Sequence, residues 1–227
     1  MSISERQEKI LLALIKEYVK TAQPLSSSFL VEKYNLGISS ATARNDMAEL
    51  EEGGYIFQPH TSAGRIPTDK AYTYYVENYL LNKESDEKIA KALVDLKFSS
   101  EDDFKKTAKV IAEISKNAVF WAFHKNDLYY TGVSNLFIQP EFKASEVVCD
   151  ISVIIDRMEE IIANIFDGLK MGEQVFIGPN NPFGNFLSSV VLKYNREGKT
   201  GVIGLLGPMR MDYERNLDLI RFLKSKL

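Results

Sequence analysis

The sequence predicts an α+β protein built from two parts, and three observations support this prediction. Apolar residues recur every three or four positions up to about residue 81, which is the spacing of amphipathic helices. After Val119, short apolar and aromatic runs alternate with helical stretches, as is typical of an α+β domain. A polar stretch from Asn82 to Asp86 separates the two patterns. We therefore expect one domain over residues 1–81, a linker with a helix over 82–99, and a second domain over 100–227.

The composition narrows the class of protein. The chain has 227 residues, of which 45% are hydrophobic and 26% charged, as in ordinary globular proteins. Neither an apolar run long enough to cross a membrane nor an apolar signal core at the N-terminus is found, so we expect a cytoplasmic protein without membrane contact. The single cysteine, Cys149, excludes an internal disulfide and a multi-cysteine zinc site. With two histidines as the other candidate ligands, we expect neither a metal nor a cofactor.

Two helices are predicted before residue 35. The first runs from Ser4 to Thr21, with Ser4 as its cap and Gln7 three residues later. Its apolar residues form one stripe: Ile10, Leu11, Leu14, Ile15, Tyr18 and Val19. Pro24 ends this segment, and the serines after Leu25 open a second helix through Tyr34, with Leu30 facing inward. Both helices are expected to pack on a third.

The third helix carries the polar face that points to function. After a turn over Asn35–Gly37, Ser39 and Ser40 are suited to cap a helix that runs to Gly53. Ala43, Met47 and Leu50 form its buried stripe. The opposite face begins with short or forked hydrogen-bonding side chains: Ser40, Thr42, Arg44 and Asn45. A recognition helix needs this set where its first turns meet base edges in the DNA major groove.

A β-hairpin wing is predicted after this helix. An extended piece over 55–58 leads into a loop, and the chain returns at Arg65–Pro67, which places Arg65 at the tip. Gly64 is expected to turn that tip with a positive φ. The alternative is a hairpin that only packs, with Arg65 paired to an acidic neighbour. The candidate DNA-binding residues are Ser39, Ser40, Thr42, Arg44, Asn45, His60, Thr61, Ser62, Arg65 and Lys70.

The charge of this domain argues mildly against nucleic acid. Residues 1–81 contain eight Lys or Arg and ten Asp or Glu, a net charge of −2, whereas nucleic-acid modules are usually basic. The acidic residues fall mostly on the first helix and at the far end of the third. We therefore expect positive and negative charges to lie on separate surfaces of this domain. We also expect few phosphate contacts per subunit and a modest dependence of DNA binding on salt.

The sequence of the second half predicts helices around a small sheet. A tyrosine-rich helix after Pro67 either stacks on bases or, as we favour, packs on the first domain. Strands are predicted over 119–125, 128–133, 174–177, 188–194 and 201–206, with a helical segment near Asn185 and a last helix from Asp212. A long helix over 144–169 has two apolar rows. The row of Val148, Ile155 and Ile162 meets either a second copy or the protein's own sheet, and Cys149 is expected to be an inert core thiol.

One stretch resembles a known family. Residues 39–72 read SSATARNDMAELEEGGYIFQPHTSAGRIPTDKAY and are similar to the winged-helix region of the HrcA family, the bacterial heat-shock transcription repressors. The run from His60 to Asp69 is the most specific part of the match. The departures are Ala43 and Gly53, where the family tends to carry larger aliphatic residues.

Three segments of the second half also resemble that family. They are GVSNL with QPEF over 132–142, Gly178 with Asn181-Pro182, and GLLGPMRMDY over 204–213. The family uses them in a GAF-like domain with an antiparallel sheet. A substantial insert that its full-length members use in dimer contacts is missing here. For Arg210, a structural role bonding carbonyls or a carboxylate is favoured over ligand binding.

The resemblance implies a sequence-specific repressor of chaperone operons. Such a protein binds an inverted-repeat operator in double-stranded DNA as a homodimer, loses its hold under heat stress and has a GroEL-type chaperonin as a partner. Catalysis is disfavoured, because His60 beside Thr61 and Ser62 has no carboxylate to orient it. The alternative function is a winged-helix regulator whose GAF-like domain binds a small-molecule effector. Its best candidate pocket is the aromatic strand around Trp121 and Phe123, although core packing explains that strand equally well.

Overall fold

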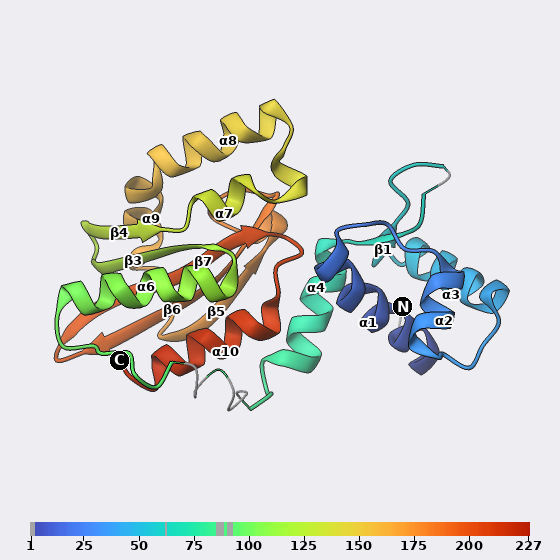
Figure 1. The fold of residues 1–227 in the computed structure, drawn as a ribbon, viewed down its shortest axis with the longest axis horizontal. Helices are drawn as coiled ribbons and strands as arrows, with labels where there is room; N and C mark the ends of the chain where they lie inside the picture. The colour runs from blue at the N-terminus through green and yellow to red at the C-terminus, as the bar shows by residue number, and fades with distance from the viewer. Residues whose placement is uncertain (1–2, 62, 85–88, 90–92) are drawn as a thin grey trace. The chain divides into compact units, whose positions relative to one another are not determined.

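The computed structural model describes residues 3–61, 63–84, 89 and 93–227 (Figure 1). The chain divides into two compact units, residues 1–82 and 83–227, each described below by itself. Most of the helix predicted within 82–99 falls on residues outside the described ranges. Over the described ranges, every helix is too short or too polar to cross a membrane.

The first unit consists of helices followed by a short hairpin. Each of its four α-helices begins after a residue whose hydroxyl accepts a backbone hydrogen bond from the first turn: Ser4, Ser26, Ser39 and Thr68. The elements are α1 (Glu5–Thr21), α2 (Ser27–Tyr34), α3 (Ser40–Glu52), β1 (Ile56–Phe57), β2 (Ile66–Pro67), α4 (Asp69–Tyr75) and η1 (Val76–Leu80), a π-helical continuation of α4. Three helices and an antiparallel hairpin in this order make a winged helix-turn-helix, as predicted.

The core of this unit lies where α1, α2 and α3 meet. Leu14 and Leu30 are fully buried there, and the predicted stripe of α3 is confirmed, since Ala43, Met47 and Leu50 are all buried. A carboxylate is buried with them. Glu17 accepts hydrogen bonds from Lys33 Nζ (2.6 Å) and the Tyr34 hydroxyl (3.0 Å), which ties α1 to α2.

The tyrosines after Pro67 pack on the protein. Tyr72 is buried, and the Tyr74 hydroxyl donates to the Glu8 carboxylate on α1. The rings of Tyr74 and Tyr79 lie edge to face with centroids 6.3 Å apart. This is the packing arrangement favoured from the sequence, except that the Tyr72 hydroxyl is buried and does not lie at the rim of the core.

The second unit is an antiparallel sheet with helices on both faces. Its elements are α6 (Glu101–Ser115), β3 (Ala118–His124), β4 (Asp127–Thr131), α7 (Ser134–Phe137), η2 (Pro140–Phe142), α8 (Ser145–Asp156), α9 (Met158–Phe166), β5 (Gly172–Ile177), η3 (Gly178–Asn180), β6 (Leu187–Arg196), β7 (Lys199–Pro208) and α10 (Tyr213–Lys224). The sheet has five strands in the order β4-β3-β7-β6-β5, each antiparallel to its neighbours. The predicted α+β class with an antiparallel sheet is confirmed.

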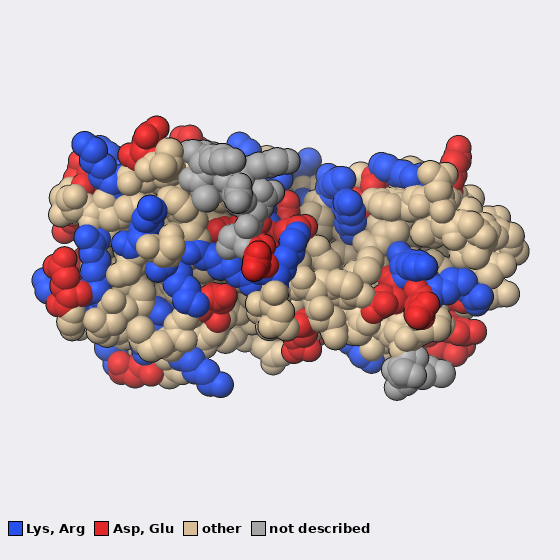
Figure 2. All heavy atoms as spheres, turned by 90° about the horizontal axis from the view of Figure 1, so that it is seen from below, with Lys and Arg blue, Asp and Glu red and all other residues tan. Residues whose placement is uncertain are grey.

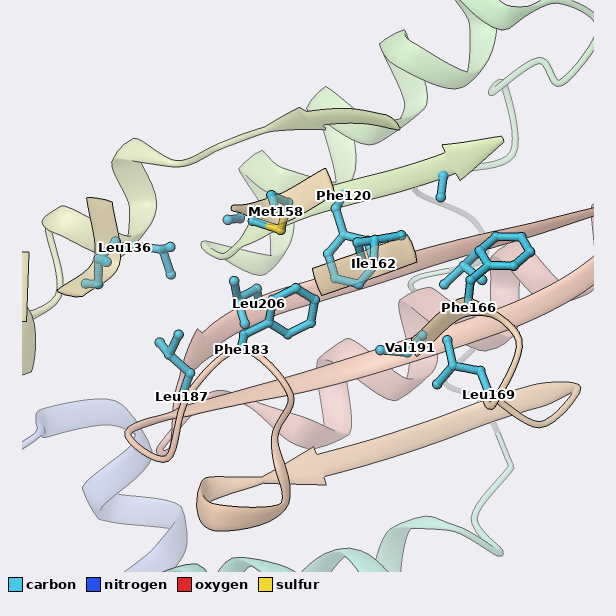
Figure 3. Close-up of a cluster of buried hydrophobic side chains, with 14 of the residues drawn as sticks. Phe120, Leu136, Met158, Ile162, Phe166, Leu169, Phe183, Leu187, Val191 and Leu206 are labelled. Atoms are coloured by element: carbon cyan, nitrogen blue, oxygen red, sulfur yellow. The ribbon is translucent and has the colours of Figure 1, made fainter. Parts of the chain in front are cut away.

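Alternation along the strands separates two cores. Phe120 on β3 and Val191 on β6 point to the face covered by α7, α8 and α9, where Met158 and Ile162 meet them (Figure 3). Trp121, one residue along, points to the opposite face and packs on Phe104 of α6, with ring centroids 5.0 Å apart. Successive side chains of a strand point to opposite faces, so one strand supplies both cores.

The predicted single helix over 144–169 is wrong in one respect. The helix is interrupted at Arg157, whose φ of −99° and ψ of 10° lie outside the helical region. Only Ile151 is buried in α8, whereas α9 buries Met158, Ile162 and Phe166. The interruption therefore separates a mostly exposed helix from one whose apolar face packs on the sheet.

Two predictions tied to that helix change with it. Ile162, proposed for a contact with a second copy, is buried in the unit's own core, and Ile155 packs against the same core. The expectation of a buried Cys149 is wrong, because its side chain is exposed. Position 149 lies two residues from Ile151, about 200° around the helix, and therefore faces away from the sheet.

The segments that carry the resemblance in the second half contact one another. The Arg210 guanidinium donates to both oxygens of the Glu141 carboxylate and to Gln139 Oε1 (2.7 Å). This joins the turn before α10 to the segment around η2, and it is the structural role predicted for Arg210. The helical segment predicted near Asn185 is wrong. That stretch forms turns, and the short 3-10 helix lies earlier, at η3.

Candidate nucleic-acid interface

The first turn of α3 is built by a hydroxyl pair. Ser39 Oγ accepts the backbone N–H of Thr42 (3.0 Å) and lies 2.9 Å from Thr42 Oγ1. Ser39 is therefore the N-cap of α3, and Ser40 is exposed beside it. The orphan N–H groups at such an end also favour an anionic partner such as phosphate.

Arg44 and Asn45 are the exposed forked side chains of this face. Within the described part of the chain, neither has a hydrogen bond or ion pair to another residue. Arg44 lines a hollow of about 370 Å³ together with residues of α2 and the wing, among them Ser27, Thr61 and Arg65. The fold thus brings three predicted DNA-binding residues, Arg44 of α3 with Thr61 and Arg65 of the wing, to one hollow.

The wing is anchored at its base to the start of α2. Leu25 and Arg65 exchange two backbone hydrogen bonds, of 2.9 and 2.8 Å, next to the β1–β2 pair. The prediction that Arg65 lies at the tip is therefore wrong, because the backbone pairing with Leu25 holds it at the base. The reason given for Gly64 is also wrong, since Gly64 does not have a positive φ. Instead, a Cβ on Gly64 would lie 2.3 Å from the carbonyl carbon of Leu25, so only glycine allows this approach.

The side chain of Arg65 pairs with an acidic residue of α3. Its Nε donates to Glu51 Oε2 (2.9 Å), while Glu51 Oε1 accepts the backbone N–H of Gln58 (2.9 Å). Gln58 in turn donates to the carbonyls of Thr61 (3.0 Å) and Ala63 (2.8 Å). The ion pair is the alternative described for Arg65 from the sequence. It leaves 22% of the Arg65 side chain exposed.

The remaining predicted contacts divide between the wing loop and the far end of α3. His60 and Thr61 are exposed in the loop, and Ser62 lies outside the described residues. Lys70 donates to the carbonyl of Gly53 (2.7 Å) and lies 4.4 Å from the centre of the Tyr55 ring. It therefore caps the C-terminal end of α3, a helix about 20 Å long, and is not brought together with Arg44 and Asn45.

Two contacts from α1 hold α3 in place. The Arg6 guanidinium forms a forked pair with the buried Asp46 (2.7 and 2.9 Å), and the pKa of Arg6 is raised mainly by this hydrogen-bonded pair. Gln7 Nε2 also donates to Glu49 Oε2 (2.5 Å). Sequence reasoning did not single out Arg6, Asp46, Glu51 or Gln58. Their partners are distant in the chain, and a polar residue on a helix face carries no sequence signal of such a pair.

The charges show no broad field of one sign on the face in view. Figure 2 shows Lys and Arg side chains next to Asp and Glu side chains over both units. Around α3 the acidic residues Asp46 and Glu51 each have a basic partner. The unpaired positive charge of Arg44 therefore stands out near the N-terminal end of α3, despite the net negative charge of the sequence.

Known proteins resemble this chain in both sequence and fold. At the fold level, a crystal structure of a protein described only as hypothetical superposes with a TM-score of 0.84 at 19% identity, covering 99% of this chain and 97% of the other. In sequence, the heat-inducible transcription repressor HrcA of Carboxydothermus hydrogenoformans is 29% identical over an alignment of 332 residues, covering 99% of this chain and 97% of the relative. This alignment exceeds the 227 residues of the chain, so about a hundred positions of the relative have no counterpart here.

Two further relatives of the same name match more locally. The protein of Pelotomaculum thermopropionicum is 33% identical over 171 residues, 73% of this chain and 49% of the relative. That of Thermoanaerobacter pseudethanolicus is 56% identical over 82 residues, 36% of this chain and 24% of the relative. These relatives are named as transcription repressors and not as enzymes. The profile of the HrcA protein C terminal domain matches residues 68–217, about two thirds of the sequence, and the chain therefore belongs to the HrcA family.

Proposed function

We propose that this chain represses heat-shock chaperone operons in the cytoplasm by binding an inverted-repeat operator as a homodimer. In this proposal, unit 1 binds the DNA and unit 2 holds the dimer and regulates it. Repression occurs by occlusion of the promoter, without chemistry. Family membership supports the class of function, and the geometry of α3 supports the residues.

The observation that carries the proposal is the free, exposed pair Arg44 and Asn45 on the first turns of α3. A guanidinium fork can bond O6 and N7 of one guanine together, and an amide can bond N6 and N7 of adenine. Both side chains belong to a helix that is fixed to α1 through Asp46, so their docking orders the side chains but not the backbone that carries them. Ser39, Ser40 and Thr42 at the helix start would contact the neighbouring backbone.

The wing would contact the DNA backbone or the minor groove. His60, Thr61 and Ser62 supply small polar groups to the loop, and Arg65 lies in the same hollow as Arg44. Because Glu51 neutralises Arg65 in the free protein, a phosphate would have to compete with that carboxylate. Lys70, at the other end of α3, would reach only a flanking phosphate.

Dimerisation is part of the proposal because an inverted repeat is matched by a two-fold symmetric protein. A single acidic winged helix would also bind weakly, and two on one site gain affinity through effective concentration. The contact belongs to unit 2, but not to the row containing Ile162, which is buried. On α8, Val153 has 54% of its surface exposed and is the better candidate. A GroEL-type chaperonin is proposed as a further partner, as the family resemblance implies.

A band-shift assay tests the DNA-binding proposal. The full chain is titrated onto the inverted repeat found upstream of chaperone operons and onto a scrambled duplex, at physiological salt. We expect Arg44→Ala to lose about 1–3 kcal/mol of binding free energy and to relax the preference at one position of each half-site. Lys16→Ala, which removes an equal charge from an exposed site on α1, is the matched control. Equal affinity of the wild type for both duplexes would refute the proposal.

Sedimentation at micromolar concentration tests the dimer. The wild type is expected to sediment as a dimer, free or on operator DNA, and Val153→Glu is expected to shift it towards monomer. Ser152→Glu, an exposed neighbour on α8, controls for added charge. A wild-type chain that stays monomeric on the operator would end the dimer proposal, while a dimer insensitive to Val153→Glu would place the interface elsewhere in unit 2.

A further inference from the structure

Unit 2 contains a cavity that operator binding does not use. It has a volume of about 330 Å³ and lies between the start of α6 and the ends of the β3–β4 and β6–β7 hairpins. This volume is near the lower end of the range for small-molecule sites, about 300 to 1,000 Å³. The cavity is therefore large enough for a compact organic molecule.

Aromatic side chains form much of its wall. Phe104 of α6 is central, with ring centroids 6.1 Å from Phe98 and 5.8 Å from Phe123. Trp121 lies behind this wall, fully buried, with its centroid 5.0 Å from that of Phe104. Rings held in this way offer flat apolar surfaces, which suit a planar ligand.

Tyr194 completes the wall and is held rigidly. Its hydroxyl accepts a hydrogen bond from Trp121 Nε1 (2.8 Å), and burial raises the pKa of Tyr194. The ring lies across its partner on the adjacent strand, Gly201, where an added Cβ would lie 2.4 Å from the tyrosine oxygen. The absence of a side chain at Gly201 therefore fixes where the Tyr194 ring can lie.

One cation of the cavity has an unused donor. Arg196 Nη1 is buried and has no hydrogen-bond partner among the described residues. Its guanidinium carbon lies 5.3 Å from the centre of the Phe104 ring. Its nearest carboxylate is that of Glu197, with 3.9 Å between Arg196 Nε and Glu197 Oε1, and the Glu197 side chain is 85% exposed. A buried N–H without a partner costs free energy, and because the Arg196 side chain is 30% exposed, the rest of its guanidinium is open to an acceptor in the cavity.

The acidic groups at the cavity do not cancel this charge. Glu101 is paired with Lys105, and Asp127 lies 3.6 Å from His124. Lys199, exposed on the neighbouring strand, adds a second positive charge opposite Arg196 in the strand pairing. Asp127 and the distant Glu197 have no permanently charged basic partner close by, whereas Arg196 and Lys199 place two positive charges opposite each other on paired strands, where an anion would bind.

We propose that this cavity binds a small planar organic carboxylate, with its ring between Phe104, Phe123 and Tyr194 and its carboxylate on Arg196. A guanidinium fork matches a carboxylate bidentately, and the aromatic wall accounts for the planar body. The proposal rests only on unit 2. The test of this ligand proposal contains no DNA, so its outcome is independent of whether the protein binds an operator.

Benzoate is the probe, titrated into the full chain and followed by the fluorescence of Trp121, the only tryptophan of the sequence, and by calorimetry. Benzamide keeps the ring without the charge, and acetate keeps the charge without the ring. We expect saturable binding of benzoate, and at least about tenfold weaker binding of either analogue, which corresponds to about 1.4 kcal/mol. Equal binding of benzoate and benzamide, or the absence of any saturable signal, would overturn the proposal.

Arg196→Gln locates the site. It should weaken benzoate binding at least about tenfold and leave benzamide binding unchanged, since it removes the charge-assisted bond and little of the wall. Arg215→Gln removes the same charge from α10, where Arg215 pairs with Asp212 outside the cavity, and should change neither. Circular dichroism checks that both variants fold. If Arg196→Gln is misfolded, the benzoate-to-benzamide comparison on the wild type still decides the question. A folded Arg196→Gln variant that binds benzoate normally would refute the site.

Discussion

Replacing Gly64 by alanine should detach the base of the wing from α2. In the structure, an added Cβ would lie 2.3, 2.4 and 2.5 Å from the carbonyl carbon, oxygen and nitrogen of Leu25. These are backbone atoms, so no side-chain rotation can relieve the clash. The two strands must separate, and the two backbone hydrogen bonds between Leu25 and Arg65 are lost or stretched.

The expected magnitude follows from those two bonds. A hydrogen bond of this kind contributes about 0.5–1.5 kcal/mol net, so we expect Gly64→Ala to lower the stability of unit 1 by about 1–3 kcal/mol. The loss should be local first, because the bridge is short and lies at the edge of the unit. Operator affinity should also fall, since the hollow shared by Arg44 and the wing loses its shape.

Hydrogen exchange measures this directly. The amides of Leu25 and Arg65 are the donors of the bridge, and they should exchange faster in Gly64→Ala than in the wild type, while urea unfolding reports the total loss. Gly168→Ala is the control, since a Cβ there would meet only the carbonyl of Ile165 at an ordinary 3.6 Å. Unchanged protection of both bridge amides in Gly64→Ala would show that this account of the wing is wrong.

Three further predictions concern unit 1. Arg65→Ala should weaken operator binding and make its salt dependence shallower. Glu51→Gln frees Arg65 but keeps a hydrogen-bond acceptor, so it should make the salt dependence of binding steeper. If salt titrations of a band shift show no change in slope for either variant, Arg65 is a purely structural residue. Ser39→Ala should cost about 1 kcal/mol of unfolding free energy through loss of the cap of α3, measured in urea against Ser40→Ala, whose side chain lacks this role. The hydrogen bond from Lys33 lowers the pKa of Glu17 below its ordinary 4.5, so its stabilisation is present above about pH 4.5 and is lost as the pH falls further. Glu17→Gln should therefore reduce the loss of stability between pH 7 and the acid range, and an identical acid profile would contradict this.

Local signals in the sequence were enough to predict most of the fold. The caps at Ser4, Ser39 and Thr68 are hydroxyl residues immediately before an apolar periodicity, and their hydrogen bonds form within a few residues. The strands of unit 2 could be predicted because each of them coincides with a short apolar run. The helix α3 could be predicted for the same reason, because its buried stripe and its polar face share one stretch of chain.

Features that depend on distant partners could not be predicted. In the sequence, Asp46 has the pattern of a surface acid, and only the structure places Arg6 beside it. Glu51 belongs to the acidic end of α3, and only the structure shows that it binds Arg65. The reason for Gly64 lies in the backbone of Leu25, 39 residues earlier. The interruption at Arg157 has neither proline nor glycine to mark it.

The way α3 is held has a consequence for how operator preference can change over evolution. Its attachments run through Asp46 and Glu49 to α1, through Glu51 to the wing, and through its last turn to Lys70. Arg44 and Asn45 take part in none of them. If these two side chains read bases, as proposed, substitutions there alter the preference without breaking any of the contacts that hold α3, so that a new binding preference can be selected in single steps at little cost in stability.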